Sequence, residues 1–349
     1  MMVSRATSSL AAPQHGPRPL PLFLEMLRSE TATSAERQAR ALAGLRRYQE
    51  APRVRRTMAP VKRRQGRARL RDYGGSGRPV LIVPSLINPP FILDLMPERS
   101  LVRWLATQGF RVWLLDWGEP APADRAQSVT GHIEQLLLPL LRRFHVPPIL
   151  VGYCLGGTMS LAAAASGLTA GVATIAAPWH FDGYGDAARA HMAALWSAAE
   201  PGCAQLGLVP IEVLQAGFWK LDPARTIAKY EAFADMSGDA AAMFVAMEDW
   251  ANAGAPLTYA AGAELFERML VADLPGRGAW KVAGVTVDPL ALPCPATEFV
   301  SLGDRIVPAA TAIGLPDRRD LGAGHVGMVV GSRARAQLWE PLRDWLGGI

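Results

Sequence analysis

Cysteine and histidine are scarce in this sequence, with three and six copies among 349 residues. Three cysteines do not make a disulfide framework in a chain of this length, which favours a reducing cytoplasm as the compartment. No C-x-x-C or H-E-x-x-H pattern occurs, and neither Cys203 nor Cys294 has a histidine or another cysteine at metal-ligand spacing. We therefore expect no metal site.

Long apolar runs are missing as well. No stretch of about 18 uncharged apolar residues is present, which is the least that a transmembrane helix requires. The amino terminus has Arg5 but no apolar run followed by a cleavage site, so we expect neither a transmembrane segment nor a signal peptide. Hydrophobic residues still make up 50% of the sequence, which is ample for the core of one large α/β domain with an insertion, or of two domains.

Acidic residues are nearly absent from one segment, between Arg37 and Arg71. It contains 13 lysines and arginines but a single acid, Glu50, which gives +12 in a chain of net charge +5 and leaves −7 for the remainder. We interpret this segment as a solvated basic arm, with contact to a polyanion, an acidic partner or a charged granule surface as the alternative. It lacks aromatic interleaving and a nucleic-acid fold signature, so no nucleic-acid partner is expected.

The most specific motif is Gly152-Tyr153-Cys154-Leu155-Gly156. The apolar run at residues 148–151 predicts a short buried strand before it, and small residues predict a helix after it. This order matches the nucleophile elbow of α/β-hydrolases, which exposes the central side chain at the carboxyl end of a sheet. Cys154 is therefore the candidate nucleophile, although most free cysteines are simply small buried side chains. A thiol in place of the usual hydroxyl favours acyl transfer on thioesters.

The acid and the base of a catalytic triad are expected after the nucleophile, in that order. Asp304 follows a predicted strand at residues 295–301 and is the candidate acid, while Asp116 is the runner-up. His325 lies in a glycine-rich loop and is the candidate base, because a thiol needs an imidazole within about 3 Å. A turn aspartate and a solvated loop histidine are the simpler interpretations of Asp304 and His325.

The remaining histidines are weaker candidates. We expect His132 and His145 at the surface or with their hydrogen bonds satisfied, since they flank a predicted helix. His180 and His191 follow a predicted strand, and either of them is a minor candidate for the wall of a pocket.

Strands alternate with helices along most of the chain. Apolar runs predict strands at residues 79–84, 111–115, 148–151, 171–176 and 295–301. From Trp179 to about Leu290 the pattern is helical, which predicts a cap over the site, or else helices of the main layers. We therefore predict an α/β-hydrolase fold: a mainly parallel sheet with helices on both faces and an inserted helical cap. The expected parts are a helical and basic segment at 1–74, a core at 75–178 and 291–349, and the cap at 179–290.

At these motifs the chain resembles the polyhydroxyalkanoate (polyester) synthases. Residues 152–158 resemble the cysteine lipase box of that family, and residues 84–102 resemble its P-x-x-I/V-N, ILDL and SLV segments. Asp116-Trp117-Gly118 is similar to a run in the short, two-component synthases, whose catalytic subunit has a similar length. Asp304 and His325 match the acid and base loops. The similarity runs from about residue 75 to the carboxyl terminus and does not account for the basic segment.

The resemblance implies an acyltransferase that polymerises 3-hydroxyacyl-CoA into polyhydroxyalkanoate through an acyl-enzyme on Cys154. The CoA thioester is then a substrate, and no cofactor is required. The implied partners are a second synthase subunit or a second copy of the chain, and the surface of a polyester granule in the cytoplasm. Backbone N–H groups of Leu155 and Ile87 are the expected oxyanion hole.

One position departs from the family pattern. The family has histidine directly after the acid, in a D-H-x-x-P run, whereas this chain has Arg305 between Asp304 and Ile306. A hydrolase, either a thioesterase or an esterase, that uses the same triad is therefore one alternative function. A non-catalytic relative that binds a granule or a partner, with an unreactive Cys154, is another.

Overall fold

The computed structural model describes residues 16–52 and 56–349, so Arg53, Val54 and Arg55 of the basic segment lie outside the described residues. The chain folds into two compact units. The smaller consists of Met1–Arg56 with Asp222–Asn252, and the larger of Thr57–Leu221 with Ala253–Ile349. In the described ranges, no helix has both the length and the apolar character required to cross a membrane.

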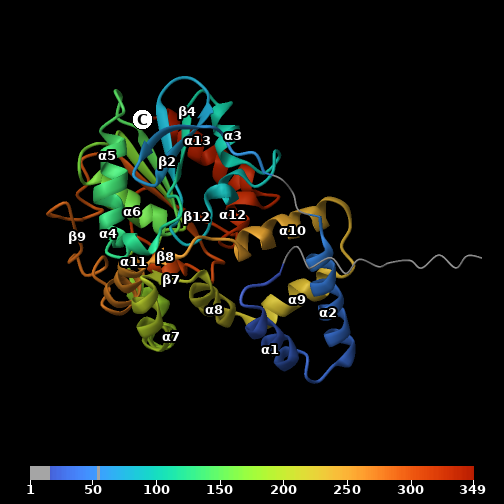
Figure 1. Cartoon of the computed structure of the whole chain (residues 1–349). Helices are drawn as coiled ribbons and strands as arrows, with labels where there is room; N and C mark the ends of the chain where they lie inside the picture. Colours follow the sequence, from blue (N-terminus) through green and yellow to red (C-terminus); the bar gives the residue numbers. More distant parts are fainter. Residues whose placement is uncertain (1–15, 53–55) are drawn as a thin grey trace, which may run out of the picture. The chain divides into compact units, whose positions relative to one another are not determined.

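An eight-stranded sheet forms the centre of the larger unit (Figure 1). The strands lie in the order β1 (Val61–Gln65), β2 (Ala68–Gly74), β4 (Arg111–Asp116), β3 (Pro79–Val83), β5 (Ile149–Tyr153), β6 (Gly171–Ile175), β11 (Ala296–Ser301) and β12 (Arg318–Leu321). From β4 to β12 every neighbouring pair is parallel, while β2 pairs antiparallel with both β1 and β4. The prediction of a mainly parallel sheet is confirmed.

Helices cover both faces of this sheet, as predicted. Figure 1 shows α4 (Val129–His132), α5 (Leu138–Leu141) and α6 (Leu155–Ala164) on one side of the strands, with α3 (Leu101–Ala106), α12 (Gly327–Val330) and α13 (Glu340–Gly347) on the other. Strand β3 (PVLIV) is apolar along its whole length, as expected for a strand that is covered on both faces. Shorter helical turns complete the layers: η1 (Pro90–Asp94), η2 (Pro122–Asp124), η3 (Ile133–Leu137), η6 (Ala309–Thr311) and η7 (Arg335–Trp339).

A long helical insertion separates β6 from β11, where the sequence predicts a cap. The larger unit keeps two parts of it, residues 179–221 and 253–290. The first part holds η4 (Phe181–Tyr184), α7 (Asp186–Leu206), β7 (Leu208–Val209) and α8 (Ile211–Leu221). The second holds β8 (Leu257–Thr258), α11 (Tyr259–Ala263), η5 (Glu264–Val271), β9 (Lys281–Val282) and β10 (Val285–Thr286).

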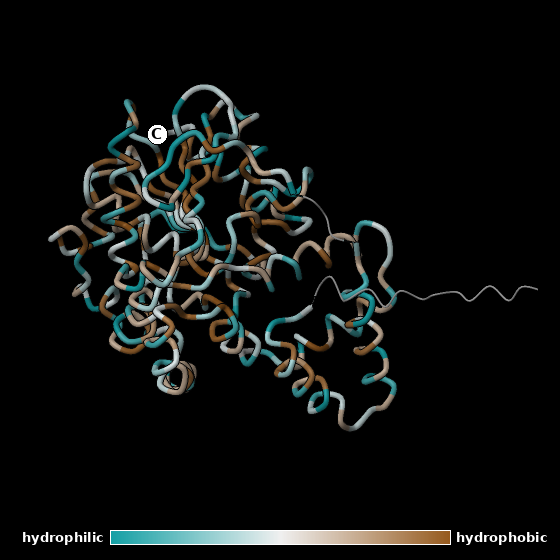
Figure 2. The backbone as a smooth tube through the Cα atoms, viewed as in Figure 1, coloured by the Kyte–Doolittle hydropathy of each residue, from teal (hydrophilic) through white to brown (hydrophobic). Residues whose placement is uncertain are grey.

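The smaller unit is helical and consists of α1 (Leu20–Glu30), α2 (Ala35–Glu50), α9 (Pro223–Phe233) and α10 (Gly238–Asn252). Teal and brown alternate along its helices in Figure 2, as expected when each helix buries one face. Its core is aromatic: Phe23 meets Tyr230 edge-on, and Phe233 stacks on Phe244 with the ring centroids 4.0 Å apart.

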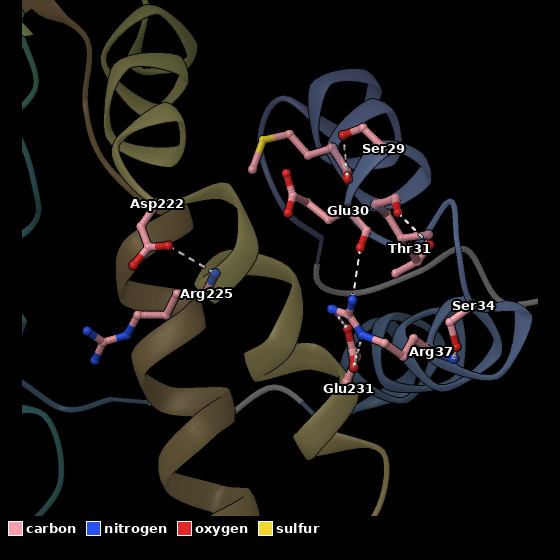
Figure 3. Close-up of polar contacts among 10 residues, drawn as sticks. Ser29, Glu30, Thr31, Ser34, Arg37, Asp222, Arg225 and Glu231 are labelled. Carbon is pink, nitrogen blue, oxygen red and sulfur yellow. Dashed lines mark hydrogen bonds and ion pairs between the residues drawn. The ribbon is translucent and has the colours of Figure 1, made fainter. Parts of the chain in front are cut away.

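Polar contacts also join the helices of the smaller unit. Figure 3 shows Ser34 capping the first turn of α2 and the Arg37 guanidinium reaching both carboxylate oxygens of Glu231 on α9, at 3.2 and 2.8 Å. Arg37 also donates to the backbone carbonyl of Glu30 at the end of α1. One arginine of the basic segment therefore connects three helices.

The structure corrects two expected boundaries. Residues 61–74, expected in the amino-terminal segment, form β1 and β2 and belong to the sheet, since their backbone pairs with β4. Residues 222–252, expected in the cap, group instead with the amino-terminal helices, because α9 and α10 share an aromatic core with α1 and α2.

Much of the basic segment makes internal contacts. Arg63 lies over the rings of Trp113 and Phe144, with its guanidinium carbon 5.0 and 4.7 Å from the two centroids. Arg71 pairs with Asp116 at 2.7 Å. These contacts give part of the segment a structural role, and contact with a polyanion remains a prediction.

Candidate active site

Cys154 lies at a sharp turn between β5 and α6, as the motif predicts. Its backbone has φ 56° and ψ −133°, a strained conformation for a residue with a side chain. The turn is held because the Cys154 N–H donates to the Ile175 carbonyl at 2.9 Å, and the Gly157 N–H donates to the Cys154 carbonyl at 2.8 Å. The surrounding backbone therefore fixes the thiol at the carboxyl end of the sheet.

The glycines on either side of Cys154 are required by close packing. A Cβ atom at Gly156 would overlap the backbone carbonyl oxygens of Val83 and Pro84. A Cβ atom at Gly152 would overlap Gly157 on the far side of the turn. The first turn of α6 can reach β3 and fold back on β5 only because these side chains are absent.

Asp304 and His325 come together from two loops that follow β11 and β12. The His325 Nδ1 and Asp304 Oδ2 atoms are 2.6 Å apart, and both side chains are buried. The other carboxylate oxygen of Asp304 accepts the N–H groups of Ile306 and Val307 at 2.8 and 3.0 Å. The carboxylate is therefore held in one orientation toward the imidazole.

The His325 imidazole is also coupled to the thiol. Burial lowers its pKa, but the negative charge of Asp304 and Cys154 and hydrogen bonds to both outweigh that effect and raise the pKa to about 10. Tyr153 supports the ring from one side by stacking on it at 5.0 Å between centroids, and its hydroxyl donates to the His325 carbonyl at 3.2 Å. The structure thus brings all three predicted triad side chains together, with the imidazole favoured in its charged form.

The two predicted oxyanion donors differ in their surroundings. Leu155 is the first residue of α6, so its N–H has no acceptor within the helix. The Ile87 N–H donates to Ser85 Oγ at 3.1 Å, so the Ser85 hydroxyl must turn aside before Ile87 can bind an oxyanion. The oxyanion role of both groups remains a prediction.

An apolar cavity opens beside the thiol. Its wall combines residues of the core with residues of the insertion: Ile87, Cys154, Leu155, Pro178, Phe181, Tyr184, Ala188, Arg189, Met192, Leu214, Gly217, Phe218, Leu265, Phe266, Leu270, Ile306 and Val307. Helices α7 and α8 and the π-helical η5 supply much of this wall. Such a cavity suits the hydrocarbon part of an acyl group better than a charged or sugar ligand.

The weaker candidates lie elsewhere. Asp116 pairs with Arg71 rather than with a histidine. The buried His132 ring donates through Nδ1 to the Ser128 carbonyl at 2.7 Å, and its Nε2 lies 2.6 Å from an Arg67 nitrogen. Burial is the main reason why the pKa of His132 falls to about 4. His180 and His191 are absent from the described cavity wall.

The other two cysteines lie apart from this cavity wall. Cys203 is buried on α7, and Cys294 lies 3.6 Å from the Thr169 hydroxyl. Across residues 16–52 and 56–349, no three histidine, cysteine or carboxylate side chains are arranged to hold a metal ion.

Comparisons with known proteins agree with this geometry. A family model described as "Poly-beta-hydroxybutyrate polymerase (PhaC) N-terminus" matches residues 75–105. The chain is 30% identical over 285 residues to the poly(3-hydroxyalkanoate) polymerase subunit PhaC of Haloferax mediterranei, an alignment that covers 76% of this chain and 58% of the relative. It is 27% identical over 299 residues to the subunit of the same name from Allochromatium vinosum, covering 77% and 80%. The chain is therefore similar to these polymerase subunits over about three quarters of its length.

Solved structures show the fold that this chain shares with other proteins. An esterase from Thermogutta terrifontis is 17% identical, with a TM-score of 0.51 and coverage of 84% of this chain and 99% of its own. A monoacylglycerol lipase from Paleococcus ferrophilus is 14% identical, with a TM-score of 0.50 and coverage of 80% and 98%. These similarities confirm the predicted α/β-hydrolase fold. The chain spans 58% and 60% of the first two curated synthase relatives, from Haloferax mediterranei and Haloarcula marismortui.

The departure from the synthase pattern lies outside the triad. Arg305 is exposed, whereas Asp304 beside it is buried and faces His325. The substitution of arginine for the usual histidine therefore leaves the acid–base contact intact.

Two tyrosines near the site were not found by sequence reasoning. Tyr153 is part of the elbow motif, but only its stacking on His325 shows that it supports the base. Tyr184 lines the cavity from the short helical turn η4 after β6, and a single tyrosine in such a turn gives no periodic or motif signal.

Proposed function

We propose that this protein is an acyltransferase that polymerises 3-hydroxyacyl-CoA into polyhydroxyalkanoate and releases CoA. The observation that carries the proposal is the Cys154 thiol at a strained elbow, coupled to the His325–Asp304 pair and facing an apolar cavity. The names of the related polymerase subunits support the same activity.

Acylation uses all three triad residues. His325 holds the proton of Cys154, and Asp304 keeps the imidazole oriented with Nδ1 toward the carboxylate. The thiolate sulfur attacks the thioester carbonyl, and backbone N–H groups of Leu155 and Ile87 bind the oxyanion. The C–S bond to CoA breaks, and the CoA thiolate takes its proton from His325. The product is an acyl thioester on Cys154.

Elongation then uses the same base. His325, now neutral, accepts the proton of a 3-hydroxyl group on the next unit or chain. That oxygen attacks the acyl carbonyl, an ester bond forms, and the Cys154 sulfur leaves and is reprotonated from His325. Exchange between two thioesters is nearly isoenergetic, and formation of an ester from a thioester is downhill, which is a physical reason for a cysteine nucleophile.

A hydrolase is the main rival, because water and a 3-hydroxyl compete for the same acyl-enzyme. The apolar wall of the cavity favours transfer, since it offers water few hydrogen-bond partners near the acyl group. The non-catalytic rival predicts an unreactive thiol, and the coupling of Cys154 to His325 argues against it.

The test is CoA release from 3-hydroxybutyryl-CoA by the protein and by Cys154→Ala, with the products analysed for polymer. Release that requires Cys154 and yields polymer supports the proposal. Release that yields only free 3-hydroxybutyrate identifies a hydrolase, and an unchanged Cys154→Ala variant identifies the non-catalytic relative.

Assembly and location form a separate part of the proposal. We propose that the chain works in the cytoplasm at the surface of a polyester granule, with a second synthase subunit or a second copy of itself. Sedimentation of the purified chain, with and without substrate, tests self-association. Fractionation of polymer-producing cells tests attachment to the granule.

A further inference from the structure

The wall of the cavity beside Cys154 contains two polar or charged side chains that the proposed mechanism does not use. Among the described residues of its wall, the polar or charged side chains are those of Cys154, Tyr184 and Arg189. Arg189 donates through Nε to the Leu270 carbonyl at 2.9 Å and through Nη2 to the Val271 carbonyl. The Arg189 guanidinium therefore already binds the last two carbonyl groups of η5.

Tyr184 differs from Arg189. Within the described part of the chain its hydroxyl has no hydrogen-bond partner, although its ring stacks on Phe181 with the centroids 6.2 Å apart. Tyr184 is half-buried in a wall that is otherwise mostly apolar, so its hydroxyl is available to bond a group that enters the cavity. The position of Tyr184 in the cavity wall suggests that the partner is a group of the substrate.

The turn that carries Tyr184 is fixed from two directions. The Phe181 N–H donates to the buried Asp273 carboxylate at 2.8 Å. The N–H groups of Trp179 and His180 both donate to the Thr311 carbonyl, at 2.7 and 3.1 Å. Since Thr311 ends η6, soon after the Asp304 loop, the phenol is positioned relative to the triad rather than carried on a loose loop.

The Tyr184 hydroxyl is a hydrogen-bond donor at any working pH. Burial raises its pKa well above the usual value, and the negative charge of Cys154 and Asp304 raises it further. The phenol therefore stays neutral beside the reacting thiol and can both donate and accept one hydrogen bond.

The acyl part of a 3-hydroxyacyl thioester has a single polar group beyond the carbonyl, its 3-hydroxyl. We propose that Tyr184 hydrogen-bonds this 3-hydroxyl inside the cavity and makes the site select 3-hydroxyacyl thioesters over plain acyl thioesters. This inference rests on the proposed function. A site built to bond a substrate hydroxyl leaves its own polar group unpaired with an analogue that lacks the hydroxyl, and it discriminates strongly for that reason.

The experiment compares 3-hydroxybutyryl-CoA with butyryl-CoA in single-turnover acylation of Cys154, measured as CoA release. Acylation isolates recognition of the entering group, because butyryl-CoA cannot elongate. The wild-type protein should favour the hydroxylated substrate, and Tyr184→Phe should reduce that ratio by about tenfold to a hundredfold through slower acylation by 3-hydroxybutyryl-CoA. The matched control is Tyr259→Phe, whose hydroxyl donates to Glu200 and which is absent from the described wall, and it should keep the wild-type ratio.

The outcomes separate the two proposals. Cys154-dependent CoA release with the same substrate ratio in Tyr184→Phe overturns the role of Tyr184 and leaves the proposed function standing. If the wild-type protein is acylated equally fast by 3-hydroxybutyryl-CoA and butyryl-CoA, the role of Tyr184 is overturned as well. That measurement does not depend on how the variant folds. Absence of Cys154-dependent release from either substrate overturns the proposed function, and the role of Tyr184 with it.

Discussion

The imidazole of His325 and the carboxylate of Asp304 face each other with 2.6 Å between Nδ1 and Oδ2. The carboxylate cannot turn away, since its other oxygen accepts two backbone N–H groups. An anionic acceptor at Nδ1 keeps a proton on that nitrogen, which leaves Nε2 to exchange a proton with the thiol. The pair therefore sets both the tautomer and the charge of the base.

Asp304→Asn should abolish most of the activity without unfolding the protein. The amide oxygen can keep the two backbone hydrogen bonds, so the amide nitrogen would face Nδ1 and favour the wrong imidazole tautomer. We expect Cys154-dependent CoA release to fall by about 10² to 10⁴-fold. Alkylation of Cys154 by iodoacetamide at pH 7 should slow as well, because the thiol loses its correctly oriented base.

The control for this variant is Asp320→Asn, which removes an exposed carboxylate from β12. It should keep wild-type rates of CoA release and alkylation. Wild-type rates in Asp304→Asn would show that this carboxylate does not orient the base.

The charged pair also predicts how stability depends on pH. The folded-state pKa of His325 is about 10, above the ordinary value of 6.5, so the folded protein retains a proton that the unfolded chain loses. The stability from this group is complete below about pH 6.5 and is lost as the pH rises through about 10. The difference in unfolding free energy between wild type and His325→Gln should therefore shrink from pH 6 to pH 10. Urea unfolding at several pH values measures it, and a constant or growing difference would contradict the assignment.

The site could be predicted from the sequence because each part has a local signal. The elbow combines a buried apolar run, two glycines and a helix, while Asp304 and His325 follow in the order that the fold imposes. The role of Tyr184 could not be predicted in this way. Its contact with the cavity depends on how η4 is tied to Asp273 and Thr311, which are distant in sequence.

The fold was predictable where strands are buried on both faces. Strands β1 and β2 were missed because they carry charges, such as Lys62 and Arg63 in β1 and Arg69 and Arg71 in β2, that give no apolar run. β1 is the edge strand of the sheet, and β2 is its neighbour. The grouping of α9 and α10 with α1 and α2 was missed for another reason. All of these helices are amphipathic, and chain order alone does not reveal which apolar faces meet.

Gly156→Ala tests the packing behind the elbow. The added methyl group would overlap the carbonyl oxygens of Val83 and Pro84, which belong to the backbone and cannot move aside easily. We expect a loss of about 3 kcal/mol in unfolding free energy, at the upper end for overpacked sites. Gly202→Ala on α7 is the control, because a Cβ atom added there would meet nothing within 4 Å. This substitution should stabilise the helix by up to about 1 kcal/mol. Equal effects of the two changes in urea unfolding would contradict the close approach.

The smaller unit offers a prediction in which packing opposes helix propensity. Gly44 lies in the middle of α2, where alanine is favoured by about 1 kcal/mol in an isolated helix. In the folded unit, however, a Cβ atom there would overlap the carbonyl oxygen of Tyr230 on α9. Gly44→Ala should therefore weaken the unit and speed hydrogen exchange of the α2 and α9 amides. Ala43→Gly, at an exposed neighbouring position, should cost only the propensity term of about 1 kcal/mol. Slower exchange in Gly44→Ala would mean that α2 and α9 do not approach this closely.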